Sequence, residues 1–413
     1  MSIWRALLHR RLSKTIRKNG LTVVFPDGSS RDYGACSSKS LAVQVSSERW
    51  LRRLVIDPDL ALGEAYMESG LDIANGDIFD LLDLIWFNVL TGAKGGRSAP
   101  AFVRRALRRL SQLNFQRRAR KNASHHYDIG NDLYRLFLEN DLQYSCAYFA
   151  SPTSTLEDAQ FAKKRAIARK LLLERGQSVL DIGCGWGGLG LHLAEHDRAR
   201  VEGVTLSDEQ LRVARERARS KGLDGQVEFH LMDYRRLGDR YDRIVSVGMF
   251  EHVGLPHYQE YFDQIARLLK DDGVTLIHTI GRTHGPGATN PWIDKYIFPG
   301  GYIPALSEIL PAIERAGLLV LDIEVLRLHY AETLNAWRRR FHANLAEVER
   351  AYDRRFIRMW DFYLAASELS FRHGEHVVFQ IQLAQRQDAA PLTRDYLYAH
   401  DDALSPPRQA AVA

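Results

Sequence analysis

The chain has 413 residues, of which 45% are hydrophobic and 26% are charged. This composition is typical of globular proteins and suffices for two domains, so it excludes a disordered chain, a collagen-like fibre and a small disulfide scaffold. The three cysteines lie far apart and form no CxxC pair, so they predict neither a metal site nor a disulfide framework. A reducing cytosol fits them best.

Positive charge is concentrated in two segments. Residues 1–20 contain six Lys or Arg, residues 97–121 contain nine, and neither segment contains an acid, although the net charge of the chain is only +5. Apolar residues at helical spacing accompany both, which favours two basic amphipathic helices that dock on an anionic membrane surface. A solvated connector helix and a nucleic-acid arm are the alternatives for 97–121, and we expect no nucleic-acid partner. No run reaches the roughly 20 apolar residues of a spanning helix, and residues 1–20 lack the apolar core of a signal peptide.

Residues 1–90 predict a small α+β domain. A helix over 1–18 is followed by a strand, a Pro-Asp-Gly turn, another strand and several helical patterns that end at Leu90. The Gly- and Ser-rich run after Leu90 is the clearest linker, so we expect residues 91–122 to be a linker with the second basic helix.

Residues 123–390 predict the catalytic domain. From Gln177 onward, apolar strands alternate with helices, which indicates a doubly wound, mostly parallel sheet. The expected strands are 178–182, 201–205, 227–231, 243–247, 274–279, 318–328 and 377–382. We expect 391–413 to be a flexible tail.

The run from Val179 to Gly188 is the most informative string in the chain. It reads as a buried strand that ends in a Gly-rich turn and opens a helix, where Gly183, Gly185 and Gly187 allow a ligand close to the backbone. The same run also satisfies GxGxxG, which is typical of dinucleotide-binding oxidoreductases.

Two details favour S-adenosylmethionine over a dinucleotide. Asp181 stands two residues before the first glycine, where an acid repels a pyrophosphate but attracts a cationic sulfonium cofactor. The next strand ends without the acid that a ribose site usually carries. Thr205 and Gln210 would therefore have to bind the hydroxyl groups of the ribose. After the third strand, Asp233 and Tyr234 would face the adenine.

Four further strings carry a resemblance to a known family. They are HYDIGNDLY at 126–134, YSCAYF at 144–149, GMFEHVG at 248–254 and HTI at 278–280. Together with the strings at 179–188 and 203–210, they resemble cyclopropane-fatty-acid-phospholipid synthases, and the related mycolic acid cyclopropane synthases and fatty-acid C-methyltransferases. The resemblance covers about residues 124–386, and the family's small N-terminal domain fits residues 1–90.

This resemblance implies a fold and a reaction. The fold is a Rossmann-like class I methyltransferase sheet, α/β and mostly parallel, with its last strand antiparallel. The reaction adds a methylene from S-adenosylmethionine across the cis double bond of an unsaturated phospholipid acyl chain. A lipid C-methyltransferase with a methyl-branched or methylene product, a silent lipid-binding protein and a nicotinamide oxidoreductase are the alternatives.

The resemblance also assigns site residues. The cofactor contacts fall on Tyr127, Tyr144, Ser145, Asp181, Gly183, Gly185, Gly187, Thr205, Gln210, Asp233 and Tyr234. A bicarbonate ion acts as the base in the family, and the residues matching its site are Cys146, Glu251, His278, Ile280 through its backbone, and Tyr330.

The chemistry explains why a base is needed. An alkene attacks the methyl group of a sulfonium only when the two are held in line, and the carbocation that forms must lose a proton for the ring to close. Bicarbonate or Glu251 itself can take that proton, and the sequence leaves both open. We expect a peripheral protein on the cytoplasmic face of the cell membrane, and the resemblance implies a homodimer. The segment 281–304, which is rich in Gly, Pro and aromatic residues, is a candidate lid or acyl-pocket wall.

Overall fold

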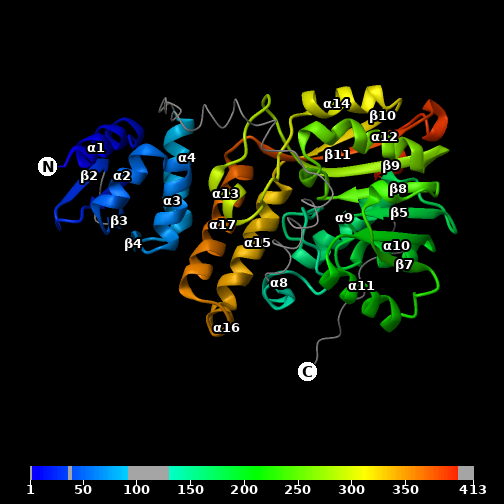
Figure 1. Ribbon diagram of the computed structural model, residues 1–413, viewed down its shortest axis with the longest axis horizontal. Coiled ribbons are helices and arrows are strands. Elements are labelled where there is room, and N and C mark those ends of the chain that lie inside the picture. The colour runs from blue at the N-terminus through cyan, green and yellow to red at the C-terminus, as the bar shows by residue number, and fades with distance from the viewer. Residues whose placement is uncertain (1, 36–39, 92–129, 399–413) are drawn as a thin grey trace. The chain divides into compact units, whose positions relative to one another are not determined.

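The computed structural model describes residues 2–35, 40–91 and 130–398. The chain divides into two compact units, each built from separated segments (Figure 1). The first unit comprises Met1–Ser111, Gly287–Gly301 and Leu334–His376, and the second comprises Gln112–Pro286, Tyr302–Thr333 and Val377–Ala413. The predicted linker and basic helix at 91–122 lie almost entirely outside the described residues, as does most of the tail.

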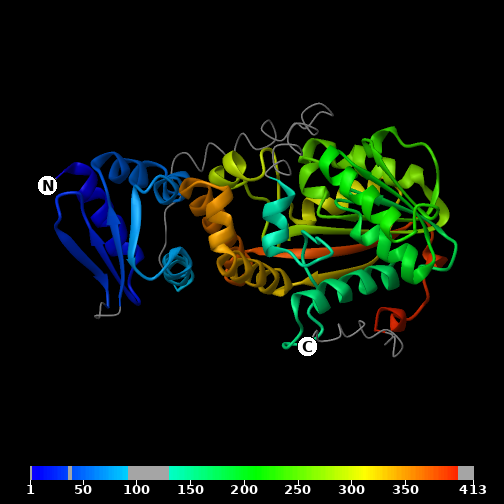
Figure 2. The same ribbon diagram turned by 90° about the horizontal axis from the view of Figure 1, so that it is seen from below.

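The first unit contains a small four-stranded sheet, whose strands are drawn in blue in Figure 2. Its strand order is β2-β1-β3-β4. β1 pairs antiparallel with β2 and parallel with β3, and β3 pairs antiparallel with β4. The strands are β1 (Gly20–Val24), β2 (Ser30–Gly34), β3 (Leu41–Val45) and β4 (Leu71–Asn75), and the accompanying helices are α1 (Ile3–Thr15), α2 (Glu48–Ile56), α3 (Pro58–Met67) and α4 (Ile78–Leu90). The prediction of a small N-terminal α+β domain is therefore confirmed.

Segments distant in sequence complete this unit. They are α13 (Pro291–Tyr296), α16 (Leu345–Ala351), α17 (Arg354–Arg372) and most of α15 (His329–Ala343). Trp292 on α13 is fully buried, and its indole N–H donates to the sulfur of Met67 over 3.2 Å. Trp292 and Ile297 of the segment 281–304 are thus buried, and its role as a lid or acyl-pocket wall stays a prediction.

The second unit is built on a seven-stranded sheet in the order β10-β11-β9-β8-β5-β6-β7. The pairs β9–β8, β8–β5, β5–β6 and β6–β7 are parallel, and β10 pairs antiparallel with β11. The strands are β5 (Ser178–Ile182), β6 (Arg200–Thr205), β7 (Val227–Leu231), β8 (Tyr241–Val247), β9 (Leu269–Arg282), β10 (Leu319–Leu326) and β11 (His376–Ala384). This mostly parallel sheet confirms the predicted fold class.

Helices cover both faces of this sheet (Figure 1). α9 (Leu156–Lys170), α10 (Gly188–Asp197) and α11 (Asp208–Ser220) pack into one hydrophobic cluster, and α12 (Tyr258–Leu268) and α14 (Leu306–Arg315) pack into another. Right-handed crossovers produce this arrangement, because strands added on opposite sides of β5 send their helices to opposite faces. The remaining elements are α8 (Asn131–Phe137), α18 (Asp395–Tyr398) and the 3-10 turns η1 (Tyr234–Arg236), η2 (Phe250–His252), η3 (Leu255–His257) and η4 (Gln387–Ala389).

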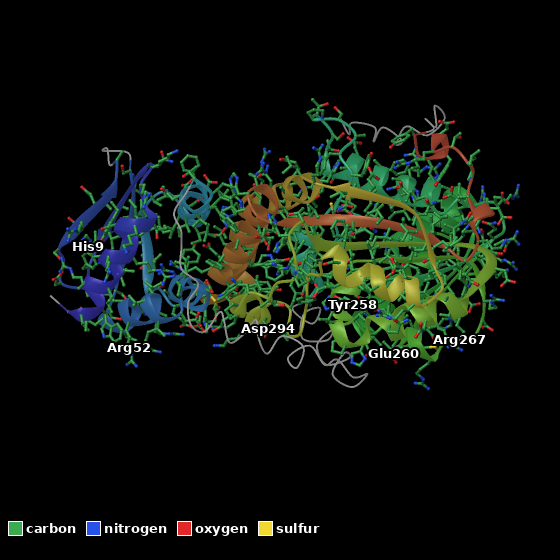
Figure 3. The ribbon with its side chains drawn as sticks, turned by 90° about the horizontal axis from the view of Figure 1, so that it is seen from above. His9, Arg52, Tyr258, Glu260, Arg267 and Asp294 are labelled. Atoms are coloured by element: carbon green, nitrogen blue, oxygen red, sulfur yellow. The ribbon has the colours of Figure 1, made fainter. Side chains whose placement is uncertain are left out.

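The sequence of α12 shows why such a helix forms and binds the sheet. Its apolar residues recur at helical spacing, so one side is buried, as at Tyr258, while Glu260 and Arg267 lie exposed on the other (Figure 3). Burying this side of the helix drives its attachment to the sheet at roughly 25 cal/mol per Å² of apolar surface.

Candidate active site

The carboxyl ends of four parallel strands bring most of the predicted site residues to one edge of the sheet. Ile182 of β5 is level with Val204 of β6 and with Ser246 of β8, and Val247 of β8 is level with His278 of β9. The Gly-rich turn, Thr205, the loop that holds Glu251, and His278 therefore all lie at this edge. In open α/β sheets, ligands bind outside the carboxyl ends of the strands.

The Gly-rich turn has the backbone that the sequence predicted. Gly183, Gly185 and Gly187 have φ of 83°, 55° and 80°, in the left-handed region that favours glycine. A Cβ on Gly187 would lie 2.6 Å from Phe229, so this residue is needed for packing. A Cβ on Gly185 would meet no atom of the described residues within 4 Å, so they leave space for a ligand above this glycine.

Asp181 is a buried acid without a full set of partners. Its Oδ2 atom is buried and accepts no hydrogen bond from any described residue. Burial raises the pKa of Asp181 to about 7, although the nearby ammonium of Lys163 opposes that shift. A cationic ligand would supply the missing partner, because a buried carboxylate is stabilised when it is paired. The site therefore fits S-adenosylmethionine better than a pyrophosphate.

Polar side chains after the next two strands are positioned by local hydrogen bonds. The hydroxyl of Thr205 donates to Oε1 of Gln210 over 2.9 Å, and both residues are buried. Asp233 accepts three hydrogen bonds from Arg235, which holds its carboxylate in a fixed orientation. Tyr234 makes an edge-to-face contact with Tyr261. The contacts of these residues with a cofactor stay a prediction.

The Tyr144-Ser145-Cys146 segment is held by a lysine that sequence analysis missed. Lys163 of α9 is fully buried, and its ammonium donates to Oγ of Ser145 and Oε1 of Gln143, each over 2.8 Å. Burial lowers the pKa of Lys163 to about 8. A lysine in a helix usually lies on a solvated face, and the only signal for this one is its helical spacing with the apolar residues of α9.

Glu251 is a second buried acid, and it lies in η2 after β8. Its Oε1 atom accepts the backbone N–H of Ile280 over 2.6 Å, while Oε2 is buried without a hydrogen-bond partner in the described part of the chain. Burial raises the pKa of Glu251 to about 7. The structure thus brings two predicted site residues, Glu251 and Ile280, into direct contact, and a carboxyl group with this pKa can exchange a proton near neutral pH.

The remaining predicted catalytic residues are also buried in the second unit. Cys146 is inaccessible, its thiol donates to the carbonyl of Ala147 over 3.3 Å, and burial raises its pKa, so it is a neutral thiol. His278 is 2% exposed near the carboxyl end of β9, and Tyr330 is 9% exposed at the start of α15. Tyr127 lies outside the described residues. No group of three or more metal-ligating side chains occurs among the residues described.

These features define the class of the protein. A mostly parallel seven-stranded sheet with an antiparallel pair at its edge, a Gly-rich turn after β5 and an acid ahead of that turn together make a class I methyltransferase.

Comparison with known proteins identifies the family. The mycolic acid cyclopropane synthetase family model matches residues 114–381, and the model of a domain of unknown function matches residues 7–89. The cyclopropane-fatty-acyl-phospholipid synthase of Escherichia coli K12 is 40% identical over 342 residues, which cover 82% of this chain and 86% of that protein. The chain belongs to the mycolic acid cyclopropane synthetase family. It is an S-adenosylmethionine-dependent methyltransferase of the cyclopropane-fatty-acyl-phospholipid synthase type, as its motifs predicted.

Two further relatives show how widely the similarity extends. The tuberculostearic acid methyltransferase UfaA1 of Mycobacterium tuberculosis is 35% identical over 402 residues, which cover 91% of this chain and 90% of that protein. The mycolic acid cyclopropane synthase CmaA1, solved in complex with S-adenosylhomocysteine and CTAB, aligns with a TM-score of 0.61 at 32% identity. That alignment covers 64% of this chain and 97% of CmaA1.

Proposed function

We propose that this enzyme converts the cis double bond of an unsaturated phospholipid acyl chain into a cyclopropane ring. S-adenosylmethionine supplies an electrophilic methyl group, and the alkene supplies the electron pair of the new carbon–carbon bond. The resulting carbocation closes to a ring when the added methyl group loses a proton. The observation that carries the proposal is Glu251, a buried carboxyl group with a pKa of about 7 at the same sheet edge as the Gly-rich turn. A simple N- or O-methyltransferase has no need to remove a proton from carbon.

The protein's contribution is to position the reactants and to exclude water. Asp181 would pair with the positive charge of the cofactor, and the open space above Gly185 would admit it to the backbone. Asp233 and Tyr234 would face the adenine, and Thr205 with Gln210 would bind the ribose hydroxyls. Burial of the acids and of His278 keeps the reaction in a poorly hydrated environment, where the carbocation escapes capture by water.

Two bases fit the proton transfer. The family resemblance implies a bicarbonate ion, which His278, Tyr330, Cys146 and the Ile280 amide would hold. Glu251 is the alternative, although its Oε1 atom already accepts the Ile280 amide that bicarbonate would use. Turnover in carbon dioxide-depleted buffer distinguishes them: a loss restored by added bicarbonate identifies the ion, and unchanged turnover identifies Glu251.

The test of the reaction itself is a product analysis. Purified enzyme would be incubated with methyl-labelled S-adenosylmethionine and vesicles of unsaturated phospholipid, and the fatty acids would be analysed by mass before and after ring-opening hydrogenation. A product heavier by one methylene that lacks an alkene and yields methyl-branched chains on ring opening supports cyclopropanation. Absence of label from the lipid would refute the proposal.

The name of one relative suggests a different product for this enzyme. UfaA1 is named a tuberculostearic acid methyltransferase, so a methyl-branched or methylene product is the alternative for this chain. The same analysis separates the two, because a methylated chain that resists ring opening or retains its double bond carries no ring.

We further propose that the enzyme docks on the anionic face of the cell membrane through its basic helices. No helix within the described ranges is long and apolar enough to cross a membrane. α1 exposes the apolar side chains of Ile3 and Leu7 together with Arg10 and Lys14, a combination that suits a lipid–water interface. The second basic helix, at 97–121, lies outside the described residues. The homodimer that the resemblance implies would be tested by measuring the mass of the protein in solution.

A further inference from the structure

His278 is held by a buried series of polar side chains that no site assignment includes. The side-chain amide nitrogen of Gln380, on β11, lies 3.0 Å from Nδ1 of His278, on the neighbouring strand β9. The amide oxygen of Gln380 accepts a hydrogen bond from the ammonium of Lys170, at the end of α9. That ammonium also pairs with the carboxylate of Glu324 on β10.

The fold places these groups on one face of the sheet. Along β11, Phe379 and Ile381 belong to the hydrophobic cluster beneath α12 and α14, so Gln380 between them points to the opposite face, where α9 packs. Gln380 is fully buried, and only 5% of the Lys170 side chain is exposed. Gln380, Lys170 and His278 are buried polar residues, which are costly unless each is hydrogen-bonded, and here each of them is.

The hydrogen-bond chemistry of this series admits one arrangement. A lysine ammonium has donors only, so the atom of Gln380 that faces Lys170 must be the amide oxygen. The amide NH2 of Gln380 is therefore the group that faces His278. Because that NH2 is a donor, Nδ1 of His278 must accept, and the imidazole must carry its proton on Nε2.

The charges around His278 keep the imidazole neutral. Burial, together with the nearby ammonium groups of Lys163 and Lys170, lowers the pKa of His278 well below its ordinary range. Burial lowers the pKa of Lys170, while its ion pair with Glu324 and the nearby Asp322 oppose that shift and favour the charged ammonium.

We propose that Gln380 and Lys170 are positioning residues that fix His278 as the neutral tautomer with its proton on Nε2. In that form, His278 donates a hydrogen bond to an oxygen atom bound at the site and does not remove the substrate proton itself. The inference rests on the proposed function, and it assigns proton removal to Glu251 or to a bound oxyanion. Among the described residues, Nε2 of His278 has no hydrogen-bond partner, so its N–H is available to such an oxygen.

The tautomer can be measured directly. Full-length enzyme labelled with [15N]histidine would be studied by NMR from pH 6 to pH 9, and the His278 signals would be identified by their loss in His278→Gln. We expect the shifts of a neutral ring protonated on Nε2 across this whole range. A ring protonated on Nδ1, or an imidazolium, would overturn the inference.

The substitution Gln380→Glu tests whether Gln380 sets the tautomer of His278. A carboxylate next to Nδ1 accepts rather than donates, so the proton should move to Nδ1 or the ring should become an imidazolium. Gln382→Glu is the matched control, because Gln382 is equally buried on the same face of β11 but bonds to the carbonyl of Lys170 and to Tyr396 instead of His278. An unchanged tautomer in Gln380→Glu would refute the role of this residue.

A second variant covers the case in which an added buried acid prevents folding. Lys170→Met replaces the aliphatic part of the side chain with one of the same length but removes the ammonium. The Gln380 amide is then free to turn over, and we expect a mixture of both tautomers. A single unchanged tautomer in Lys170→Met would exclude Lys170 from the series.

Kinetics separate positioning from a general loss of structure. In Gln380→Glu, we expect kcat to fall at least about tenfold, while KM for S-adenosylmethionine stays within about threefold. An equal fall in Gln382→Glu would mean that the effect is merely structural. The NMR spectra can be recorded without any turnover, so the two proposals fail separately. An enzyme that shows the expected tautomer but does not methylate lipid would refute the proposed function and leave the tautomer assignment intact.

Discussion

At the scale of single residues, Glu251 carries the reaction that we propose. Glu251→Gln preserves the size of the side chain and its ability to accept from the Ile280 amide, but it removes a group that can take a proton. We expect turnover to fall at least about a hundredfold, with S-adenosylmethionine binding within about threefold of the unchanged enzyme by calorimetry. Glu228→Gln, on the exposed side of β7, is the control. Wild-type turnover in Glu251→Gln would remove this residue from the site.

The activity should also depend on pH through Glu251. A base must be deprotonated to act, and burial raises the pKa of Glu251 to about 7. Turnover should therefore increase as pH rises through about 7 and then reach a plateau. A rate that is flat from pH 5.5 to 8 under saturating substrates would contradict a role for this carboxylate in proton transfer.

Asp181 should link cofactor binding, stability and pH. Its pKa is raised by burial from 3.8 to about 7, so the folded protein holds this proton over a pH range in which the unfolded chain has lost it. The contribution of Asp181 to folding stability therefore decreases as pH rises from about 4 to about 7. Relative to the unchanged protein, Asp181→Asn should become more stable as pH rises over that range, as measured by denaturant unfolding without ligand.

The same substitution, Asp181→Asn, should also weaken the binding of the cofactor. Loss of the carboxylate removes the partner of a cationic ligand, so we expect S-adenosylmethionine to bind about ten- to a hundredfold more weakly to Asp181→Asn at pH 8. Asp224→Asn, in an exposed turn, should bind normally. Equal affinities for the two variants would place the positive charge of the cofactor away from Asp181.

Some of these residues could be predicted from sequence and others could not. Asp181 and the glycines lie at the end of one strand and directly after it, so their spacing in the sequence is enough to predict a ligand-binding turn. Lys163 could not be predicted, because a lysine on a helix is normally solvated, and its burial depends on contacts with Gln143 and Ser145 of an earlier segment. Gln380 was missed because its partner His278 is 102 residues away in the chain.

At the scale of elements, the Gly-rich turn offers a matched pair of substitutions. Gly187→Ala would place a Cβ 2.6 Å from Phe229 in the core and should destabilise the fold. The methyl group of Gly185→Ala would meet no atom of the described residues within 4 Å, so its cost should be limited to the backbone strain of about 1–2 kcal/mol that a left-handed alanine carries. Its methyl group would nevertheless occupy the open space, and we expect cofactor affinity to fall at least about tenfold. Normal binding to Gly185→Ala would mean that the cofactor lies elsewhere.

The strands of the sheet were predictable because their signals are local. β5 and β7 were predicted with the bounds that the structure shows, since each is a short apolar run between turn residues. β9 is longer than expected at both ends, from Leu269 to Arg282. At its start, Leu269 pairs with Tyr241 of β8, but the polar run that follows it interrupts the apolar pattern, and the register shifts before Val274 pairs with Arg243. Local patterns could not show that extension.

At the scale of the whole molecule, the assignment of late segments to the first unit could not be predicted. α13 and α17 follow the strands of the second unit in sequence, yet they pack with α3. The contact of Trp292 with Met67 joins residues that are 225 positions apart, and the hydroxyl of Tyr66 donates to Asp361 over 3.0 Å. Such pairings depend on side chains that meet only in the folded state.

Membrane docking is a property of the whole molecule and gives the last prediction. Lys or Arg side chains near an anionic surface contribute about 1 kcal/mol each, so reversing the charges of Arg104, Arg105, Arg108 and Arg109 should weaken vesicle binding more than about a hundredfold. Substituting aspartate for the exposed Ile3 and Leu7 of α1 should weaken it further, because both apolar side chains would leave the interface. Leu392→Asp, at a still more exposed leucine near the other end of the chain, is the control. Sedimentation with anionic and zwitterionic vesicles at two salt concentrations would measure these effects, and binding that is unchanged by the charge reversals would make residues 97–121 a connector rather than a docking helix.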